Sequence, residues 1–264
     1  MTKIGTAAKK VGKTMYARLD MTLSADKDLS FQMPSSFHGA LMEQLEPEYA
    51  AELHSSQLHP YTQHLERKED EWHWVVTALN ERACQEIIEK KLLKLQEFKL
   101  NKHQIDLKIM DRRYTELSKR ELAFNFYQNS QSPYISLRFL TPTAFKYQGR
   151  YINYPELSYL YSNLMNKYDA ADDEESMQDE DTLEQLIRNT SISRYDLHSI
   201  AFSMEGIRIP AFLGTMTLRI HGTQTMCNFA NMLFQFSEYS GIGIKTALGM
   251  GAVRYCDSGQ FLKN

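Results

Sequence analysis

A glycine-rich stretch near the end of the 264-residue chain has the composition of an anion-binding loop. It runs Ser240-Gly-Ile-Gly-Ile-Lys-Thr-Ala-Leu-Gly-Met-Gly251, with two Gly-X-Gly pairs on either side of Lys245. Glycine permits positive φ and lets a backbone approach a ligand closely, and successive exposed N–H groups form a concave anion site. A glycine-rich connection that binds nothing is the alternative. The residues expected to bind the anion are Gly241, Gly243, Lys245, Gly249 and Gly251.

The residues around this stretch exclude two familiar nucleotide-binding motifs. A dinucleotide fingerprint requires a third glycine where Thr246 stands, and a P-loop requires glycine in place of Ile244. Both motifs also lie between a strand and the helix that follows it. Here a helix is expected before the glycines, at 225–238, and a short strand after them, at 250–255. A mononucleotide pocket is therefore not expected.

Histidine is the second residue type suited to chemistry here, because its unperturbed pKa of about 6.5 lies near neutral pH. His38 has the best position among the eight histidines. If Ser35 or Ser36 caps a helix, His38 falls in its first turn, where free N–H groups and the helix dipole favour an anion. A packed core histidine is the alternative, since Met42 and Leu45 share its helical face. His59 and His64 look like a pair, but ordinary loop polarity explains them.

The formal charge of −3 conceals an uneven distribution. Eight acidic residues and no Lys or Arg fall between 172 and 184, and removing those eight negative charges from −3 leaves +5 on the rest of the chain. An acidic surface insertion at 171–184 therefore hides a mildly basic body. Nucleic acid remains among the expected partners.

Cysteine usage and hydropathy indicate a cytoplasmic protein. The three cysteines are widely spaced, with no Cys-X-X-Cys, which argues against a disulfide framework or a structural zinc site. No apolar run approaches the ~18–20 residues that cross a membrane. Residues 1–14 carry four lysines and no acid, which indicates a basic arm or a frayed end rather than a secretion signal. No group of histidines and carboxylates has metal-ligand spacing, so no cofactor is expected.

Hydrophobic periodicity predicts an α+β protein built from two similar halves. Each half fits a βαββαβ plan, in which helices pack on one face of an antiparallel sheet. The expected domains are an N-terminal one at 15–128 and a C-terminal one at 129–264. The expected strands are 15–23, 71–79, 98–100, 104–110, 134–140, 193–204, 214–220 and 250–255, and the expected helices are 35–45, 48–55, 81–95, 155–168, 182–188 and 225–238.

The glycine-rich stretch closely resembles the C-terminal signature of the CRISPR-associated endoribonucleases that cut precursor crRNA, the sixth Cas family of the RAMP superfamily. Three further segments are similar to the same family: Phe37-His-Gly-Ala-Leu-Met42, Leu53-His54 after Pro47-Glu-Tyr-Ala50, and Thr141-Pro-Thr-Ala-Phe-Lys146. The amino-acid sequences of these segments look most like those of family members that accompany type III-A systems. The resemblance spans about residues 15 to 256.

The resemblance implies two tandem ferredoxin-like domains and metal-independent cleavage within the CRISPR repeat RNA. In the family's reaction the ribose 2′-OH attacks the adjacent phosphorus, which leaves 2′,3′-cyclic phosphate and 5′-OH ends. The protein must supply in-line placement, proton transfer and positive charge. The family often places its catalytic histidine where His38 stands. Its partner varies between a tyrosine, a lysine, a serine and a second histidine, and Ser36 is the candidate nearby.

The segment 145–154 offers further RNA contacts, because Lys146, Arg150 and Tyr147 interleave cations that hold phosphates with rings that stack on bases. A hairpin whose tyrosines pack on the core is the alternative. A non-catalytic RNA-binding subunit of a CRISPR ribonucleoprotein complex, or a protein scaffold, is the alternative to the nuclease. Transient contact with a type III effector complex and a monomeric or homodimeric state are expected.

Overall fold

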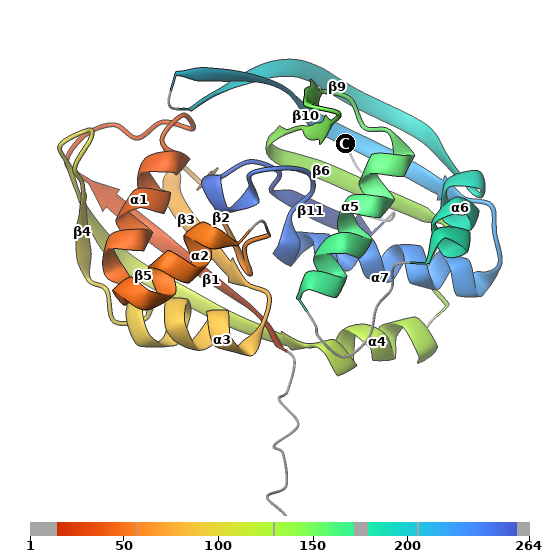
Figure 1. Ribbon diagram of the computed structural model, residues 1–264, viewed down its shortest axis with the longest axis horizontal. Coiled ribbons are helices and arrows are strands. Elements are labelled where there is room, and N and C mark those ends of the chain that lie inside the picture. Colours follow the sequence, from red (N-terminus) through yellow and green to blue (C-terminus); the bar gives the residue numbers. More distant parts are fainter. Residues whose placement is uncertain (1–14, 57, 129, 172–178, 205, 258–264) are drawn as a thin grey trace, which may run out of the picture.

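The computed structural model describes residues 15–56, 58–128, 130–171, 179–204 and 206–257. The expected basic arm at 1–14 lies outside these residues, as do 172–178 of the expected acidic insertion. The described chain forms two large antiparallel sheets that lie side by side, each with helices packed on it, and a small two-stranded one (Figure 1).

The first sheet has the strand order β2-β3-β1-β5-β4 and is antiparallel throughout. Without the edge strand β4, this is the order of a ferredoxin-like βαββαβ unit. Its strands are β1 (Met15–Ala25), β2 (Tyr61–Lys68), β3 (Glu71–Ala78), β4 (Glu97–Leu100) and β5 (Ile105–Ser118). Its helices are α1 (Pro34–Gln44), α2 (Pro47–Ser55) and α3 (Glu81–Ala83), which continues as a π-helix over Cys84–Leu92.

The second sheet has the order β11-β6-β10-β9 and repeats the same plan. Its strands are β6 (Tyr134–Thr143), β9 (Thr190–Met204), β10 (Ile207–Ile220) and β11 (Val253–Asp257). Its helices are α5 (Leu157–Ala170), α6 (Glu180–Arg188) and α7 (Gln224–Ser240), and α4 (Lys119–Gln128) connects the two sheets. The prediction of two tandem ferredoxin-like units is confirmed.

Two segments differ from the prediction. The stretch after His59 was expected to be a polar loop, but it forms β2, whose first six residues are all buried. Polar side chains are buried there because one face of β2 packs on the N-terminal core and the other meets the C-terminal half. Residues 145–152 form a small hairpin, β7 (Phe145–Tyr147) and β8 (Arg150–Ile152), as the alternative for that segment required, but Tyr147 and Tyr154 are exposed and do not pack on the core.

Helix α7 belongs to both halves of the molecule. One face packs on the second sheet through Leu233 and Phe234. The other face carries Phe236 to the open face of the first sheet, where its ring lies 5.1 Å from that of Tyr16. The backbone carbonyl of Tyr239 accepts hydrogen bonds from two threonine hydroxyls of the first sheet, at 2.6 and 3.1 Å. A continuous apolar and hydrogen-bonded contact therefore joins the two sheets.

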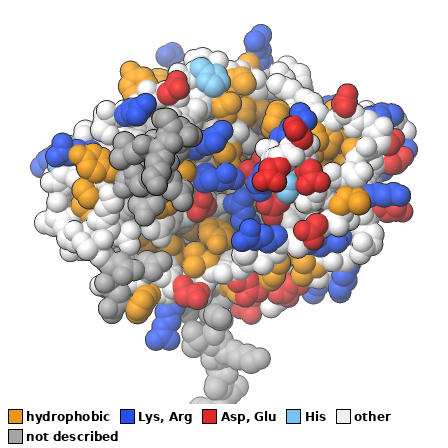
Figure 2. Space-filling view, turned by 180° about the vertical axis from the view of Figure 1, so that it is seen from behind, with side chains coloured by type: hydrophobic (Ala, Val, Ile, Leu, Met, Phe, Trp, Pro, Cys, Tyr) orange, Lys and Arg blue, Asp and Glu red, His pale blue; other side chains and the backbone are white. Residues whose placement is uncertain are grey.

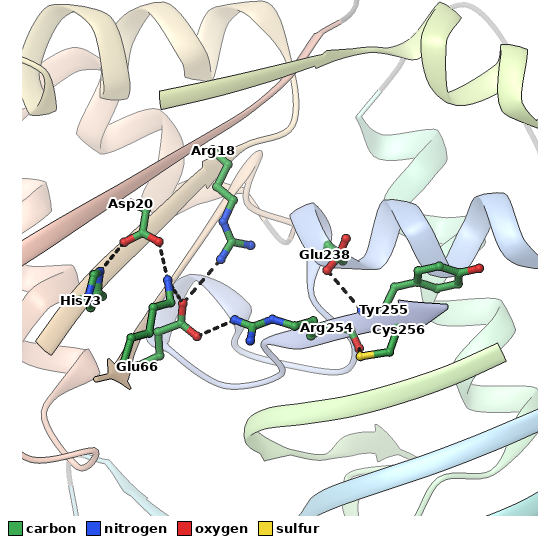
Figure 3. Close-up of polar contacts among 9 residues, drawn as sticks. Arg18, Asp20, Glu66, His73, Glu238, Arg254, Tyr255 and Cys256 are labelled. Carbon is green, nitrogen blue, oxygen red and sulfur yellow. Dashed lines mark hydrogen bonds and ion pairs between the residues drawn. The ribbon is translucent and has the colours of Figure 1, made fainter. Parts of the chain in front are cut away.

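An ion-pair network extends this contact (Figure 3). Glu66 on β2 pairs with Arg254 of β11 at 3.0 Å, with Arg18 of β1 at 3.7 Å and with Lys68. Lys68 also pairs with Asp20, whose second oxygen lies 2.7 Å from Nδ1 of His73. Because Glu66 is buried, its cationic neighbours compensate a charge that would otherwise be poorly solvated. The network links β11 of the second sheet to β1, β2 and β3 of the first.

The glycine-rich stretch passes from the end of α7 into the N-terminal half (Figure 1). Ala247, in a short 3₁₀ turn, is 1% exposed and is part of the N-terminal hydrophobic core. Gln63 Nε2 donates to the carbonyls of Ala247 at 3.2 Å and Pro34 at 2.9 Å, while Trp74 Nε1 donates to Gln63 Oε1 at 3.0 Å. Gly249 then lies against Pro34, the first residue of α1.

The contact between Gly249 and Pro34 predicts a large effect of a single methyl group. Gly249 has φ +96°, and a Cβ there would lie 2.1 Å from Cβ of Pro34. We expect Gly249→Ala to lower the free energy of unfolding by about 2–4 kcal/mol, from backbone strain and overpacking together. Denaturant unfolding measures this. The control is Gly39→Ala in α1, whose Cβ would meet nothing within 4 Å. Equal stability of the two variants would contradict the prediction.

Candidate functional site

Helix α1 presents His38 differently from the expectation. The helix begins at Pro34 with Met33 as its N-cap and without a side-chain cap, so the prediction of a Ser35 or Ser36 cap is wrong. Proline is favoured at the first helical position because its φ is fixed and it lacks an N–H. His38 is therefore one turn beyond the free N–H groups of this helix. A direct role for the helix N-terminus at His38 is not supported.

The imidazole of His38 contacts both halves of the molecule. Its Nδ1 lies 2.9 Å from the hydroxyl of Tyr61 on β2, and the two rings are parallel within 3°. A hydrogen bond to the Ala247 backbone raises its pKa. A bond that favours the charged ring is donated by the ring, so the acceptor is the Ala247 carbonyl. If the ring donates to Ala247 through Nε2, Nδ1 accepts from the Tyr61 hydroxyl.

His38 is nevertheless neutral near pH 7. Burial, followed by the neighbouring His59 and His54, lowers its pKa to about 4, against which the Ala247 bond is the weaker effect. Burial also raises the pKa of Tyr61, so that its hydroxyl keeps its proton. The pair is thus a neutral imidazole held by a neutral phenol. A tyrosine hydroxyl both donates and accepts, so it can hold either tautomer of the ring.

His59 completes a small cluster at this point. Its ring centroid lies 6.3 Å from that of His38 and 5.7 Å from that of Tyr61, and its buried Nδ1 has no hydrogen-bond partner within the described residues. His64 lies elsewhere, buried in β2 on the face that meets the C-terminal half, and burial lowers its pKa to about 3. The two histidines are therefore not a pair, and His64 is not in a loop.

Ser36 points away from His38. Its hydroxyl lies 2.9 Å from Nε2 of His103, in the turn between β4 and β5. Residues two apart on a helix do not face each other, and the structure places Tyr61 rather than Ser36 against His38. Tyr61 was missed because its segment was not recognised as a strand. Its polar alternation, Tyr-Thr-Gln-His-Leu-Glu, is the only sequence signal that could have shown it.

The glycine-rich stretch is not an open cradle of glycine N–H groups, so that expectation is wrong. The N–H groups of its four glycines bond to the Ser237, Thr246 and Pro142 carbonyls and to Oδ1 of Asn163, at 2.8 to 3.4 Å. The glycines are needed because each has a positive φ and packs too closely for a Cβ. Lys245 also has a left-handed backbone conformation, with φ 57°, and it lines a cavity.

That cavity, of about 350 Å³, lies between the two halves, beside the His38 cluster. Lys146 of the hairpin, Lys167 of α5 and Lys245 of the glycine-rich stretch line it, together with His59. No Asp or Glu is among its described lining residues. Tyr147 and Arg150 are exposed on the hairpin and do not line it. The structure thus places Lys146 and Lys245 at the same cavity, whereas Tyr147 and Arg150 do not line it.

The charges elsewhere are mixed. On the face opposite that of Figure 1, basic side chains gather near the middle with acidic ones among them (Figure 2).

Within the described residues, no three His, Cys, Asp or Glu side chains are grouped so that they could hold a metal ion. No described helix is long and apolar enough to cross a membrane.

Comparisons with known proteins agree with this architecture. The family model for CRISPR-associated endoribonuclease Cas6 matches residues 137–253. A solved structure described as a Cas6 product complex superposes with a TM-score of 0.75 at 21% identity, covering 92% of this chain and 99% of its own. A Cas6-related protein from Pyrococcus furiosus gives 0.63 at 15% identity, with 92% and 99% covered. These two likenesses establish the fold.

Two relatives establish the family. A CRISPR-associated endoribonuclease Cas6 of Mycobacterium tuberculosis is 30% identical over 244 residues, which cover 90% of this chain and 77% of the relative. One of Streptococcus thermophilus is 35% identical over 218 residues, which cover 83% of this chain and 89% of the relative. The chain is thus a member of the Cas6 family of CRISPR-associated endoribonucleases.

Proposed function

We propose that this protein cleaves CRISPR precursor RNA within its repeats, without a metal ion, and so supplies guide crRNAs for antiviral defence. Membership of the Cas6 family supports this function. The observation that carries it is the meeting of His38 with the Ala247 carbonyl, beside a cavity lined by three lysines. A proton-transfer group and a concentration of positive charge adjoin at the contact between the two halves. That is the minimum that transesterification of RNA requires.

In the proposed reaction the substrate provides the nucleophile. The ribose 2′-OH attacks the adjacent phosphorus and the bond to the 5′-oxygen of the next nucleotide breaks. The products are a 2′,3′-cyclic phosphate and a 5′-hydroxyl. A neutral His38 suits the first proton transfer, because it can accept the proton of the 2′-OH. For this the Ala247 bond gives way and Nδ1–H donates to the Tyr61 oxygen, which leaves Nε2 as the acceptor.

Tyr61 is the orienting partner in this proposal, in place of the Ser36 considered from the sequence. It holds the ring from the Nδ1 side at 2.9 Å and lies parallel to it. A bound phosphate raises the pKa of a nearby imidazole, because it stabilises the charged form. The RNA thereby favours the first transfer, in which the ring takes the proton of the 2′-OH, and it keeps the ring protonated until that proton passes to the leaving oxygen.

A second candidate is a non-catalytic RNA-binding subunit. The observation in its favour is that both ring nitrogens of His38 are engaged in the free protein, by Tyr61 and Ala247.

In either function the partner is CRISPR repeat RNA, held by the glycine-rich stretch and the hairpin. We further propose residues 15–128 and 129–264 as the two domains, a type III-A setting with transient contact to a type III effector complex, and a monomeric or homodimeric state.

The first prediction concerns His38. We expect His38→Ala to lower the cleavage rate of repeat RNA by at least ~10²-fold, with RNA affinity retained. Cleavage is followed by gel electrophoresis in EDTA, and the cyclic phosphate is identified by its resistance to phosphatase until acid treatment. His221→Ala, which removes a histidine bonded to Ser191 at the far end of β9, is the control. Undiminished cutting by the His38 variant would remove this residue from the reaction. Tight binding without cutting by the wild-type protein would favour the second candidate.

The second prediction concerns Tyr61. Removal of its hydroxyl in Tyr61→Phe leaves Nδ1 of His38 without its partner at 2.9 Å. We expect kcat to fall by about tenfold, since one hydrogen bond of roughly 1.4 kcal/mol is lost, while KM is unchanged. Tyr195→Phe, on the exposed part of β9, is the matched control. A change in KM alone would show that Tyr61 contacts RNA rather than positioning the histidine.

The third prediction is the titration of His38. In the free protein its pKa is expected at about 4, because burial, His59 and His54 oppose the charged form. Repeat RNA with a 2′-deoxy sugar at the cleaved position, which cannot react, should raise that pKa through the phosphate charge. Two-dimensional NMR of the imidazole carbon-bound protons measures both values. An unperturbed pKa near 6.5 in the free protein would contradict the proposed environment.

A further inference from the structure

Lys167 is a buried cation whose charge has no anionic partner within the described chain. It lies on α5 and is 6% exposed. Its Nζ donates to the carbonyls of Ser240 and Gly241, both at 3.0 Å, and forms no ion pair with a described carboxylate. Burial lowers the pKa of this amine to about 7. Buried charges are normally paired, so an anion that enters this environment would stabilise the charged form of the amine.

The cavity beside Lys167 has the composition of an anion site. Lys146 and Lys245 line it with Lys167, from three different elements, and no carboxylate is among its described lining residues. Like charges that converge in a partly buried space repel each other unless an anion joins them. Asn163, which bonds to both backbone groups of Gly243 at 2.8 and 3.5 Å, fixes the wall between α5 and the glycine-rich stretch.

The cavity also lies beside the proposed reaction centre. His59 lines the cavity and its ring is 6.3 Å from that of His38. A strand whose scissile phosphate lies at His38 would carry a neighbouring phosphate into the cavity. Tyr151, which also lines it, has the Lys146 ammonium 5.9 Å from its ring centroid and offers a surface on which a base can stack.

From these observations we propose that the cavity binds a single backbone phosphate of the repeat RNA next to the cleaved linkage, with Lys167 as its floor and Lys146 and Lys245 as its rim. The proposal rests on the proposed function, since it places the substrate of that reaction. It adds a subsite that does not touch the reacting atoms. Because this subsite contacts the RNA backbone, it recognises the position of the strand and not its base sequence.

The test removes one charge from each side of the contact. Uncleavable repeat RNAs, each with one neutral methylphosphonate, are titrated against the wild-type protein and against Lys146→Met and Lys167→Met. A methylphosphonate at one linkage adjacent to the cleaved one should weaken binding to the wild-type protein by about tenfold. The same methylphosphonate should cause almost no further loss of binding in either lysine variant. Such non-additivity is the signature of a direct contact. The salt dependence of binding should fall by about 0.7 in log–log slope for each lysine removed.

Lys94→Met is the control, because this lysine is exposed and does not line the cavity. It should retain the full methylphosphonate effect. Lys146 is also exposed, so its variant keeps the test decisive if Lys167→Met does not fold. Additive losses at every linkage would overturn the proposal. Binding of inorganic phosphate alone, without any coupled RNA linkage, would overturn it in favour of a free anion. Wild-type protein that binds repeat RNA but never cuts it would refute the proposed function and leave the phosphate site standing.

Discussion

The structure depends on the insertion of one C-terminal segment into the core of the N-terminal half. Ala247 is buried there, and its carbonyl accepts bonds from Gln63 and His38. The same Gln63 amide holds the carbonyl of Pro34, at the start of the helix that carries His38. The position of this histidine therefore depends on both halves at once. The ion pairs of Glu66 and the apolar contacts of α7 serve the same end, because they hold the two sheets at the separation that this insertion requires.

The sequence predicted the architecture well because its signals are local. Apolar periodicity marks α7 and the π-helical segment, and the repeated element order indicates two ferredoxin-like units. It failed at β2, whose polar residues are buried only because a second half covers them. Propensity and periodicity describe a single element against solvent or one core, so a strand buried between two halves has no distinctive pattern.

The candidate site could be predicted only in part, for the same reason. Its histidine and its glycines were recognisable, but the contact between them joins residues more than 200 positions apart and depends on Gln63 and Tyr61. A glycine-rich stretch predicts anion binding only where its N–H groups are exposed. The structure instead uses those N–H groups internally, and it leaves the positive charge to lysine side chains. Glycine signatures alone do not distinguish these two uses.

The internal bonding of the glycine-rich stretch has a consequence for catalysis. Three side chains from two elements hold its backbone: Lys167 and Asn163 of α5 bond to Ser240, Gly241 and Gly243, and Gln63 of β2 bonds to Ala247. A stretch bonded in this way cannot adapt to the RNA by small increments, so the RNA must fit a preformed surface. Preorganised groups stabilise developing charge without reorganising at the moment of reaction. The glycines thus contribute to the reaction through rigidity, since each positive φ permits a close contact that keeps Lys245 and the Ala247 carbonyl in place.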